Sequence, residues 1–215
     1  HGPMPVEAFM RHCLLHPEYG YYTRLTAIGG QGDFITAPEI SQVFGDMLGF
    51  WCLDAYEKLG APPALALCEI GPGRGTLMAD VWRQCARHAP ARAAITLHLV
   101  EASPSLQAVQ QQTLTGVPAF WHRSLESLPT DRPLLILANE WLDALPIRQW
   151  VGDQERVVRV TEQGALAFAP EGVVTRETCP EMLAVRAGIE QRLRAQGGAW
   201  LVVDYGYTDP ATEDR

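Results

Sequence analysis

The 215-residue sequence lacks the features that mark several common classes of protein. Its 5 cysteines are odd in number and scattered, and no C-x-x-C pair occurs, so neither a disulfide framework nor a zinc knuckle is indicated. This cysteine usage suits a reducing compartment. No apolar run approaches the roughly 20 residues that cross a bilayer, and the start has no cationic-plus-apolar signal pattern. We therefore expect no membrane span.

Positive charge is also scarce, since the formal net charge is -8 at pH 7. A protein that binds nucleic acid usually carries a basic face, so no nucleic-acid partner is expected. An acidic chain better suits a cationic substrate.

A metal site is not predicted either. His12 and His16 have the i, i+4 spacing of metal ligands on a predicted helix. No acidic residue lies between them as in the zinc-protease pattern, and His16-Pro17 indicates a helix end.

The most informative motif that is present is Glu69-x-Gly71-x-Gly73-x-Gly75, after an apolar run. Glycines at a strand-to-helix turn let a ligand approach the backbone, and the helix N-terminus behind them offers free N–H groups. A P-loop would need a lysine, and a dinucleotide fingerprint would need glycine where Thr76 stands. The spacing is the form found in class I S-adenosylmethionine methyltransferases, although such a turn can also be purely structural.

The next predicted strand, 95–100, stops at Glu101. A carboxylate at the tip of the strand beside the glycine loop can accept hydrogen bonds from the two hydroxyls of a ribose. The alternative is a helix-capping acid, because Ser103 and Pro104 are good N-cap and N1 residues for a helix over 105–114. Both roles can hold together, and we expect Glu101 to bind ribose.

A second polar cluster, Asn139-Glu140-x-x-Asp143, follows the predicted strand 134–138. Ligands of open α/β sheets bind at this end of the strands, and two carboxylates with a carboxamide can hold a nitrogen-bearing acceptor. Methyl transfer is an in-line displacement, so position and electrostatics do most of the work. A guanidinium would arrive charged, and carboxylates would favour its loss of a proton. The alternative is that Asn139 caps the next helix and Asp143 bonds locally.

The order of apolar patterns predicts an α/β fold. The chain is long enough for one sizeable core. Strands alternate with helices and are expected at 65–68, 95–100, 118–122, 134–138 and 199–204. Such alternation predicts a mainly parallel sheet with helices on both faces.

Two other parts surround this sheet. Residues 1–60 are expected to form an N-terminal helical and loop appendage, with helices over 6–15 and 40–59. Residues 61–215 are expected to form the cofactor-binding domain, with a small antiparallel insertion at about 147–170.

Five segments in register closely resemble the MidA family of S-adenosylmethionine-dependent methyltransferases. They extend over nearly all of the chain and occupy 16–22, 32–41, 69–77, 139–146 and 204–206. The resemblance implies a Rossmann-like class I methyltransferase fold with S-adenosyl-L-methionine as cofactor. Mitochondrial members of the family are protein arginine methyltransferases that assist respiratory complex I assembly. It therefore implies symmetric dimethylation of an arginine in a complex I subunit.

Two alternatives stay open beside this activity. One is an S-adenosylmethionine-binding assembly factor that acts mainly as a scaffold, and the other is a small-molecule methyltransferase. The expected location is the mitochondrial matrix in a eukaryote or the cytoplasm in a bacterium. The sequence does not indicate an oligomeric state.

The resemblance assigns site residues by position. It implies that the cofactor contacts Glu69, Gly71, Gly73, Gly75 and Glu101, and that Asn139, Glu140 and Asp143 form the transfer site.

The segment 32–39 is expected to line the cofactor or acceptor through Asp33, Thr36 and Pro38. With the glycines at 29–32 it is predicted to act as a lid, the alternative being a loop that caps the following helix.

The sequence departs from the family pattern in two respects. The third strand ends in His122-Arg123-Ser124, without the acidic residue that usually contacts adenine. The family continues beyond Gly206 through two more strands, so we expect part of the acceptor site to lie outside this sequence.

Overall fold

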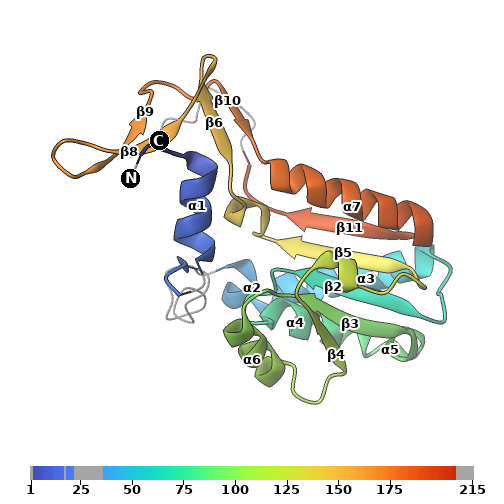
Figure 1. Ribbon diagram of the computed structural model, residues 1–215. Helices are drawn as coiled ribbons and strands as arrows, with labels where there is room; N and C mark the ends of the chain where they lie inside the picture. Colours follow the sequence, from blue (N-terminus) through green and yellow to red (C-terminus); the bar gives the residue numbers. More distant parts are fainter. Residues whose placement is uncertain (1, 17, 22–35, 207–215) are drawn as a thin grey trace.

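The centre of the computed structural model, which describes residues 2–16, 18–21 and 36–206, is a five-stranded sheet (Figure 1). Its strands run in the order β11-β5-β2-β3-β4, and every neighbouring pair is parallel. They are β2 (Leu65–Ile70), β3 (Ile95–Val100), β4 (Ala119–His122), β5 (Leu134–Asn139) and β11 (Gly198–Val203). The strand order reverses at β2 and β5, the position where α/β sheets bind ligands. The predicted α/β fold is confirmed.

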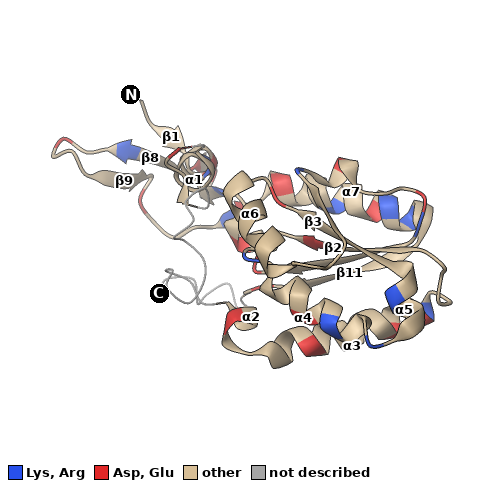
Figure 2. Ribbon diagram, turned by 90° about the horizontal axis from the view of Figure 1, so that it is seen from below, with Lys and Arg blue, Asp and Glu red and all other residues tan. Residues whose placement is uncertain are grey.

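Helices cover both faces of this sheet (Figure 2). One face packs on α3 (Gln42–Lys58), α4 (Thr76–Cys85) and α5 (Ala89–Ala94), whose buried side chains include Cys52, Tyr56 and Val81. The other face packs on α7 (Pro180–Gln196), through Ile189. The sixth helix, α6 (Pro104–Thr113), follows β3. None of the helices in the described ranges is both long and apolar enough to cross a membrane.

The helix expected over 40–59 is interrupted at its start. A short helix, α2 (Ala37–Ile40), ends at Ser41, whose backbone is extended at φ -151°. The Ser41 hydroxyl accepts a hydrogen bond from the backbone N–H of Val43 at 3.2 Å and so caps α3. The helix itself is found as α3, and its start was predicted two residues early because the serine is a better N-cap than a helix-interior residue.

Helix α3 packs closely against α4 at Gly49 of α3. A Cβ at Gly49 would lie 2.7 Å from the Cβ of Gln84, so a larger residue has no room. On the same interface Gln84 donates a hydrogen bond to Asp46 at 2.7 Å, and Arg83 pairs with Asp46 and, at 2.6 Å, with Asp80.

The antiparallel insertion forms two sheets rather than one. One has the order β10-β6-β7, from β6 (Arg148–Val151), β7 (Gln154–Glu155) and β10 (Arg176–Thr178). The other has the order β1-β8-β9, from β1 (Met4–Pro5), β8 (Val157–Val160) and β9 (Leu166–Ala169).

The insertion therefore extends beyond residue 170 and takes up the N-terminal β1, just before α1 (Val6–Leu15). Strands of two or three residues are too short to show alternation, so the sequence did not predict β1 or β10. The division of the chain at residue 60 stays a prediction.

Candidate functional site

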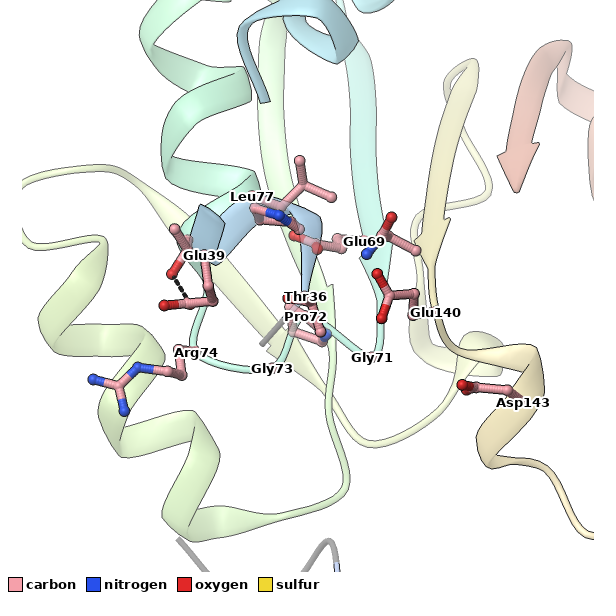
Figure 3. A pocket seen from close by; sticks show the side chains of 13 residues that line it. Thr36, Glu39, Glu69, Gly71, Pro72, Gly73, Arg74, Leu77, Glu140 and Asp143 are labelled. Atoms are coloured by element: carbon pink, nitrogen blue, oxygen red, sulfur yellow. Dashed lines mark hydrogen bonds between the residues drawn. The ribbon is translucent and has the colours of Figure 1, made fainter. Parts of the chain in front are cut away.

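A pocket lies at the carboxyl ends of β2 and β5 (Figure 3). Three segments that are separate in the sequence form its wall. They are residues 36–39, residues 69–77 with the glycine loop and the start of α4, and residues 139–143 at the end of β5. The lining residues are Thr36, Pro38, Glu39, Glu69, Gly71, Pro72, Gly73, Arg74, Thr76, Leu77, Asn139, Glu140 and Asp143. Most of the predicted site residues are therefore brought together from positions far apart in the sequence.

The glycine loop needs glycine for its backbone and for its packing. Gly71, Gly73 and Gly75 have φ angles of +64°, +52° and +83°, in the left-handed region that disfavours a side chain. A Cβ at Gly71 would also lie 2.6 Å from Cδ1 of Trp141. The loop ends at the N-terminus of α4, where Gly75 is the N-cap residue and supplies no capping side chain.

Glu69 is a buried acid on the pocket wall. It lies in β2, opposite Leu99 and Leu137, one residue before the end of the strand at Ile70. Only 3% of it is exposed, and its Oε2 atom has no hydrogen-bond partner. Burial raises the pKa of Glu69 to about 8, opposed by a hydrogen bond with the backbone of Met78. A cationic group beside this oxygen would favour the ionised form.

Glu39 lies at the N-terminus of α4, where the N-cap residue Gly75 has no side chain to interact with the helix end. The hydroxyl of Thr76 donates a hydrogen bond to Oε1 of Glu39 at 2.6 Å, shown as a dashed line in Figure 3. This places a carboxylate at the N-terminus of α4, where the helix dipole favours it. Thr36 and Pro38 line the same side of the pocket, whereas Asp33 lies outside the described residues.

Glu140 and Asp143 form the opposite wall, and both carboxylates point toward the pocket interior in Figure 3. Glu140 has a φ of +48°, which is unusual for a residue with a side chain and is typical of functional sites. Its backbone N–H donates to the carbonyl of Val203 at 2.8 Å. Burial, followed by the charges of Asp204 and Glu140, raises the pKa of Asp143. Because Asp204, Glu140 and Asp143 are all acidic, this group of side chains suits a cationic ligand.

Asn139 does not cap the following turn, whereas Asp143 has the local hydrogen bond of the alternative, with the backbone of Ala144. The short 3₁₀ helix η3 (Leu142–Ala144) receives no side-chain hydrogen bond from its N-cap residue. The backbone N–H of Leu142 instead donates to Oδ2 of Asp204 at 2.7 Å, across from β11. The Oδ1 atom of Asn139 is buried without a partner. This oxygen therefore keeps an unused acceptor beside the pocket.

Glu101 is placed one residue beyond β3 but is not among the residues that line the pocket. Its Oε1 atom accepts from the backbone N–H of Ser103 at 2.7 Å, and its Oε2 atom accepts from Gln110 at 3.2 Å. Ser103 also caps α6, as expected. Burial raises the pKa of Glu101, and the hydrogen bonds from Ser103 and Gln110 oppose this rise.

Several site residues were not predicted. Pro72, Thr76 and Leu77 line the pocket and adjoin the glycine motif, so the motif's flanks were a usable signal. Arg74 also lines it, but its side chain points away from the carboxylates in Figure 3. Glu39 belongs to the segment 32–39 that was expected to line the site, but its hydrogen bond with Thr76 was not predicted, because it depends on α2 lying beside α4. Within the described ranges no group of three His, Cys, Asp or Glu side chains could hold a metal ion.

Comparison with protein families identifies the family of this chain. Residues 47–215 match the family described as "Putative S-adenosyl-L-methionine-dependent methyltransferase". The chain belongs to this family. The resemblance drawn from the motifs is thereby confirmed. The glycine loop and the acidic wall, formed by Glu140 and Asp143, lie in a methyltransferase fold.

Curated relatives match the chain almost from end to end. Protein arginine methyltransferase NDUFAF7, mitochondrial, of Danio rerio is 34% identical over 99% of this chain and 60% of its own length. The Homo sapiens protein of the same name is 32% identical over 99% of this chain and 58% of its own. The chain thus spans about three fifths of the length of these relatives.

A solved structure has the same fold. It is a COG1565 superfamily member and likely methyl transferase, by its title, from Burkholderia thailandensis, bound to S-adenosyl-homocysteine. It aligns with a TM-score of 0.75 and 26% identity over 96% of this chain and 59% of its own.

Proposed function

We propose that this chain binds S-adenosyl-L-methionine in the pocket at the ends of β2 and β5 and transfers its methyl group to an arginine of a protein substrate. The observation that carries the proposal is Glu69, an almost fully buried carboxyl group with an unpartnered oxygen on the pocket wall. Such an atom is costly unless a ligand pairs with it. The ammonium group of the methionine part of S-adenosyl-L-methionine would pair with this oxygen.

Other residues fit the remaining parts of the same ligand. Gly71 and Gly73 line the pocket, so the loop backbone can contact the ligand there, whereas Gly75 is not a lining residue. The carboxylate oxygens of Glu101 accept one hydrogen bond from Ser103 and one from Gln110, so both keep acceptor capacity for the two ribose hydroxyls. When bound, S-adenosyl-L-methionine supplies an electrophilic methyl group on a positively charged sulfur.

The acceptor arginine would bind at the acidic wall. Glu140 and Asp143 would hold the guanidinium by charge-assisted hydrogen bonds, and the free Oδ1 of Asn139 would accept a further N–H. These contacts orient one nitrogen toward the methyl group. Methylation of that nitrogen would break the bond between the methyl carbon and the sulfur, which leaves as a neutral thioether, and the nitrogen would lose a proton to one of the two carboxylates. Residues 32–35 of the segment that the sequence predicts to act as a lid lie outside the described residues.

The names of the relatives support a proposal for the substrate and its location. We propose that the acceptor is a subunit of respiratory complex I, that the arginine is dimethylated symmetrically, and that the modification supports assembly. The curated relatives are named mitochondrial. The proposed location is therefore the mitochondrial matrix for a eukaryotic source and the cytoplasm for a bacterial one.

Peptide mapping of complex I subunits tests this function. Subunits are purified from cells that have the protein, lack it, or carry Glu140→Gln, and their peptides are weighed. An arginine peptide heavier by about 28 Da, from two methyl groups in place of two hydrogens, should be present only with the unaltered protein.

Glu140→Gln keeps the size of the side chain and removes its charge. If the mark disappears in these cells while assembly of complex I continues normally, the protein acts mainly as a scaffold. If no arginine peptide differs between cells with and without the protein, the proposed substrate is wrong.

A further inference from the structure

Gln110 is a buried glutamine whose amide is fully used around the glycine loop. It has no exposed surface, and its Nε2 group donates to the carbonyl of Gly73 at 2.8 Å and to Oε2 of Glu101 at 3.2 Å. Its Oε1 atom accepts from the indole N–H of Trp121 at 3.0 Å. Because an indole can only donate, Trp121 fixes which end of the amide faces the loop. Gln110 thus joins the loop to Glu101.

The packing around Gln110 leaves little freedom for this arrangement. A Cβ at Gly75 would lie 3.4 Å from Cγ of Gln110, so α6 lies directly against the glycine loop. Glu101 is held by Ser103 on one oxygen and by Gln110 on the other. Of these two contacts, only that from Gln110 also reaches the loop. Moving Gln110 would therefore disturb the orientation of Glu101 relative to Gly73.

We propose that Gln110 is a positioning residue for the cofactor. Its amide holds the Glu101 carboxylate in the orientation that receives the ribose hydroxyls, at a fixed position relative to the glycine loop. This rests on the proposed function, because it assumes that Glu101 binds a ribose. Gln110 itself does not touch the ligand. Its effect is on how strongly the ribose hydroxyls are bound.

The chain offers a matched control on the same helix. Gln107, one turn earlier on α6, donates to the backbone carbonyl of Glu101 at 2.7 Å, not to the carboxylate. Gln110→Met and Gln107→Met make the same chemical change and each remove a hydrogen bond to Glu101. Only Gln110→Met removes a hydrogen bond to the carboxylate, leaving the one from Ser103.

The experiment is calorimetric titration of each protein with S-adenosylhomocysteine and with its 2′-deoxyribose analogue. The unaltered chain and Gln107→Met should bind the parent compound about tenfold or more tightly than the analogue, because a hydrogen bond to a charged group is lost. Gln110→Met should bind both with nearly equal affinity. Where methyl transfer is measured, the KM for S-adenosylmethionine should rise while kcat at saturation changes little.

The outcomes separate this inference from the proposed function. If the unaltered chain discriminates and Gln110→Met discriminates as well as Gln107→Met does, the positioning role is wrong and the function stands. If the unaltered chain does not bind S-adenosylhomocysteine, the proposed function fails and this inference with it.

A second variant covers the case in which Gln110→Met does not fold. Gln110→Glu has the same size and keeps an acceptor for Trp121, but it removes the amide donors and places a second carboxyl group beside Glu101. It should also lose the discrimination between the two ligands. If Gln110→Glu retains it, the positioning role is wrong.

Discussion

Asp204, just after the end of β11, holds Leu142 in place by accepting its backbone N–H at 2.7 Å across 62 positions of the sequence. Its other oxygen accepts from the backbone N–H of Tyr205 at 2.8 Å. Asp204 thus fixes the turn that carries Asp143 into the pocket, and its charge is one cause of the raised pKa of Asp143.

Substitution of Asp204 separates these two effects. Asp204→Ala removes the hydrogen bond and should lower kcat for methyl transfer about tenfold or more. Asp204→Asn keeps an acceptor for Leu142 but removes the charge, so the pKa of Asp143 should fall. If Asp143 acts ionised, the acidic limb of the kcat profile should then shift to lower pH. A kcat for Asp204→Ala equal to that of the unaltered protein would contradict the positioning of the turn.

Glu69→Gln should stabilise the fold and weaken cofactor binding. The pKa of Glu69 is raised to about 8 in the folded chain, so its favourable contribution is complete below its unfolded value of about 4.3 and is lost as pH rises through 8. Glutamine avoids this loss. Chemical denaturation at pH 8 should show greater stability for Glu69→Gln, by roughly a few kcal/mol at most, while S-adenosylhomocysteine binds more weakly. A variant that is less stable at pH 8 would show that Glu69 is not a strained buried acid.

The histidines of β3 and β4 should make the fold sensitive to acid. His98 Nδ1 lies 2.9 Å from Nε2 of His122, and His98 Nε2 lies 3.0 Å from the hydroxyl of Thr96. Burial, followed by the charges of His122 and Arg132, lowers the pKa of His98 to about 4. The stability that neutral His98 provides is present above its unfolded pKa of about 6.5 and is lost as pH falls toward 4.

His98→Gln keeps a donor and an acceptor at this position but does not titrate. Thermal melts between pH 7 and pH 4 should therefore show a smaller loss of stability for His98→Gln than for the unaltered chain. Equal losses in both proteins would assign the acid sensitivity to other groups.

The elements that the sequence predicted are those with a local signal. Strand β5 (Leu134–Asn139) is a continuous apolar run, and α7 (Pro180–Gln196) begins at a proline and ends before Gly197, so both were found from composition and end signals. The glycine spacing likewise located the loop. A strand such as β1 (Met4–Pro5) has only two residues, and its existence depends on β8.

The same distinction applies to the site. Glu69, Glu140 and Asp143 were predicted because each lies at or near the end of an apolar run. Gln110 was not predicted, because nothing in its own helix indicates that Trp121 and Gly73 will face it. Glu101 was predicted to bind the ribose of the cofactor, and it is not among the residues that line the pocket. Long-range contacts of this kind follow from tertiary packing and have no local pattern.

Substitutions in the glycine loop and at Glu101 have matched controls elsewhere in the chain. Gly73→Val and Gly164→Val both put a β-branched residue at a left-handed φ, +52° and +82° respectively, but Gly164 lies in the hairpin between β8 and β9. Glu101→Ala is paired with Glu162→Ala, an exposed acid in that hairpin. The members of each pair thus make the same chemical change, one beside the proposed cofactor and one far from it.

Calorimetric titration of these four variants and the unaltered chain with S-adenosylhomocysteine, and separately with NADH, tests the cofactor assignment most directly. We expect the unaltered chain, Gly164→Val and Glu162→Ala to bind S-adenosylhomocysteine and none of the proteins to bind NADH. Gly73→Val and Glu101→Ala should bind it at least about tenfold more weakly while remaining folded. Binding of NADH by the unaltered chain, or unchanged S-adenosylhomocysteine affinity in both Gly73→Val and Glu101→Ala, would contradict the assignment.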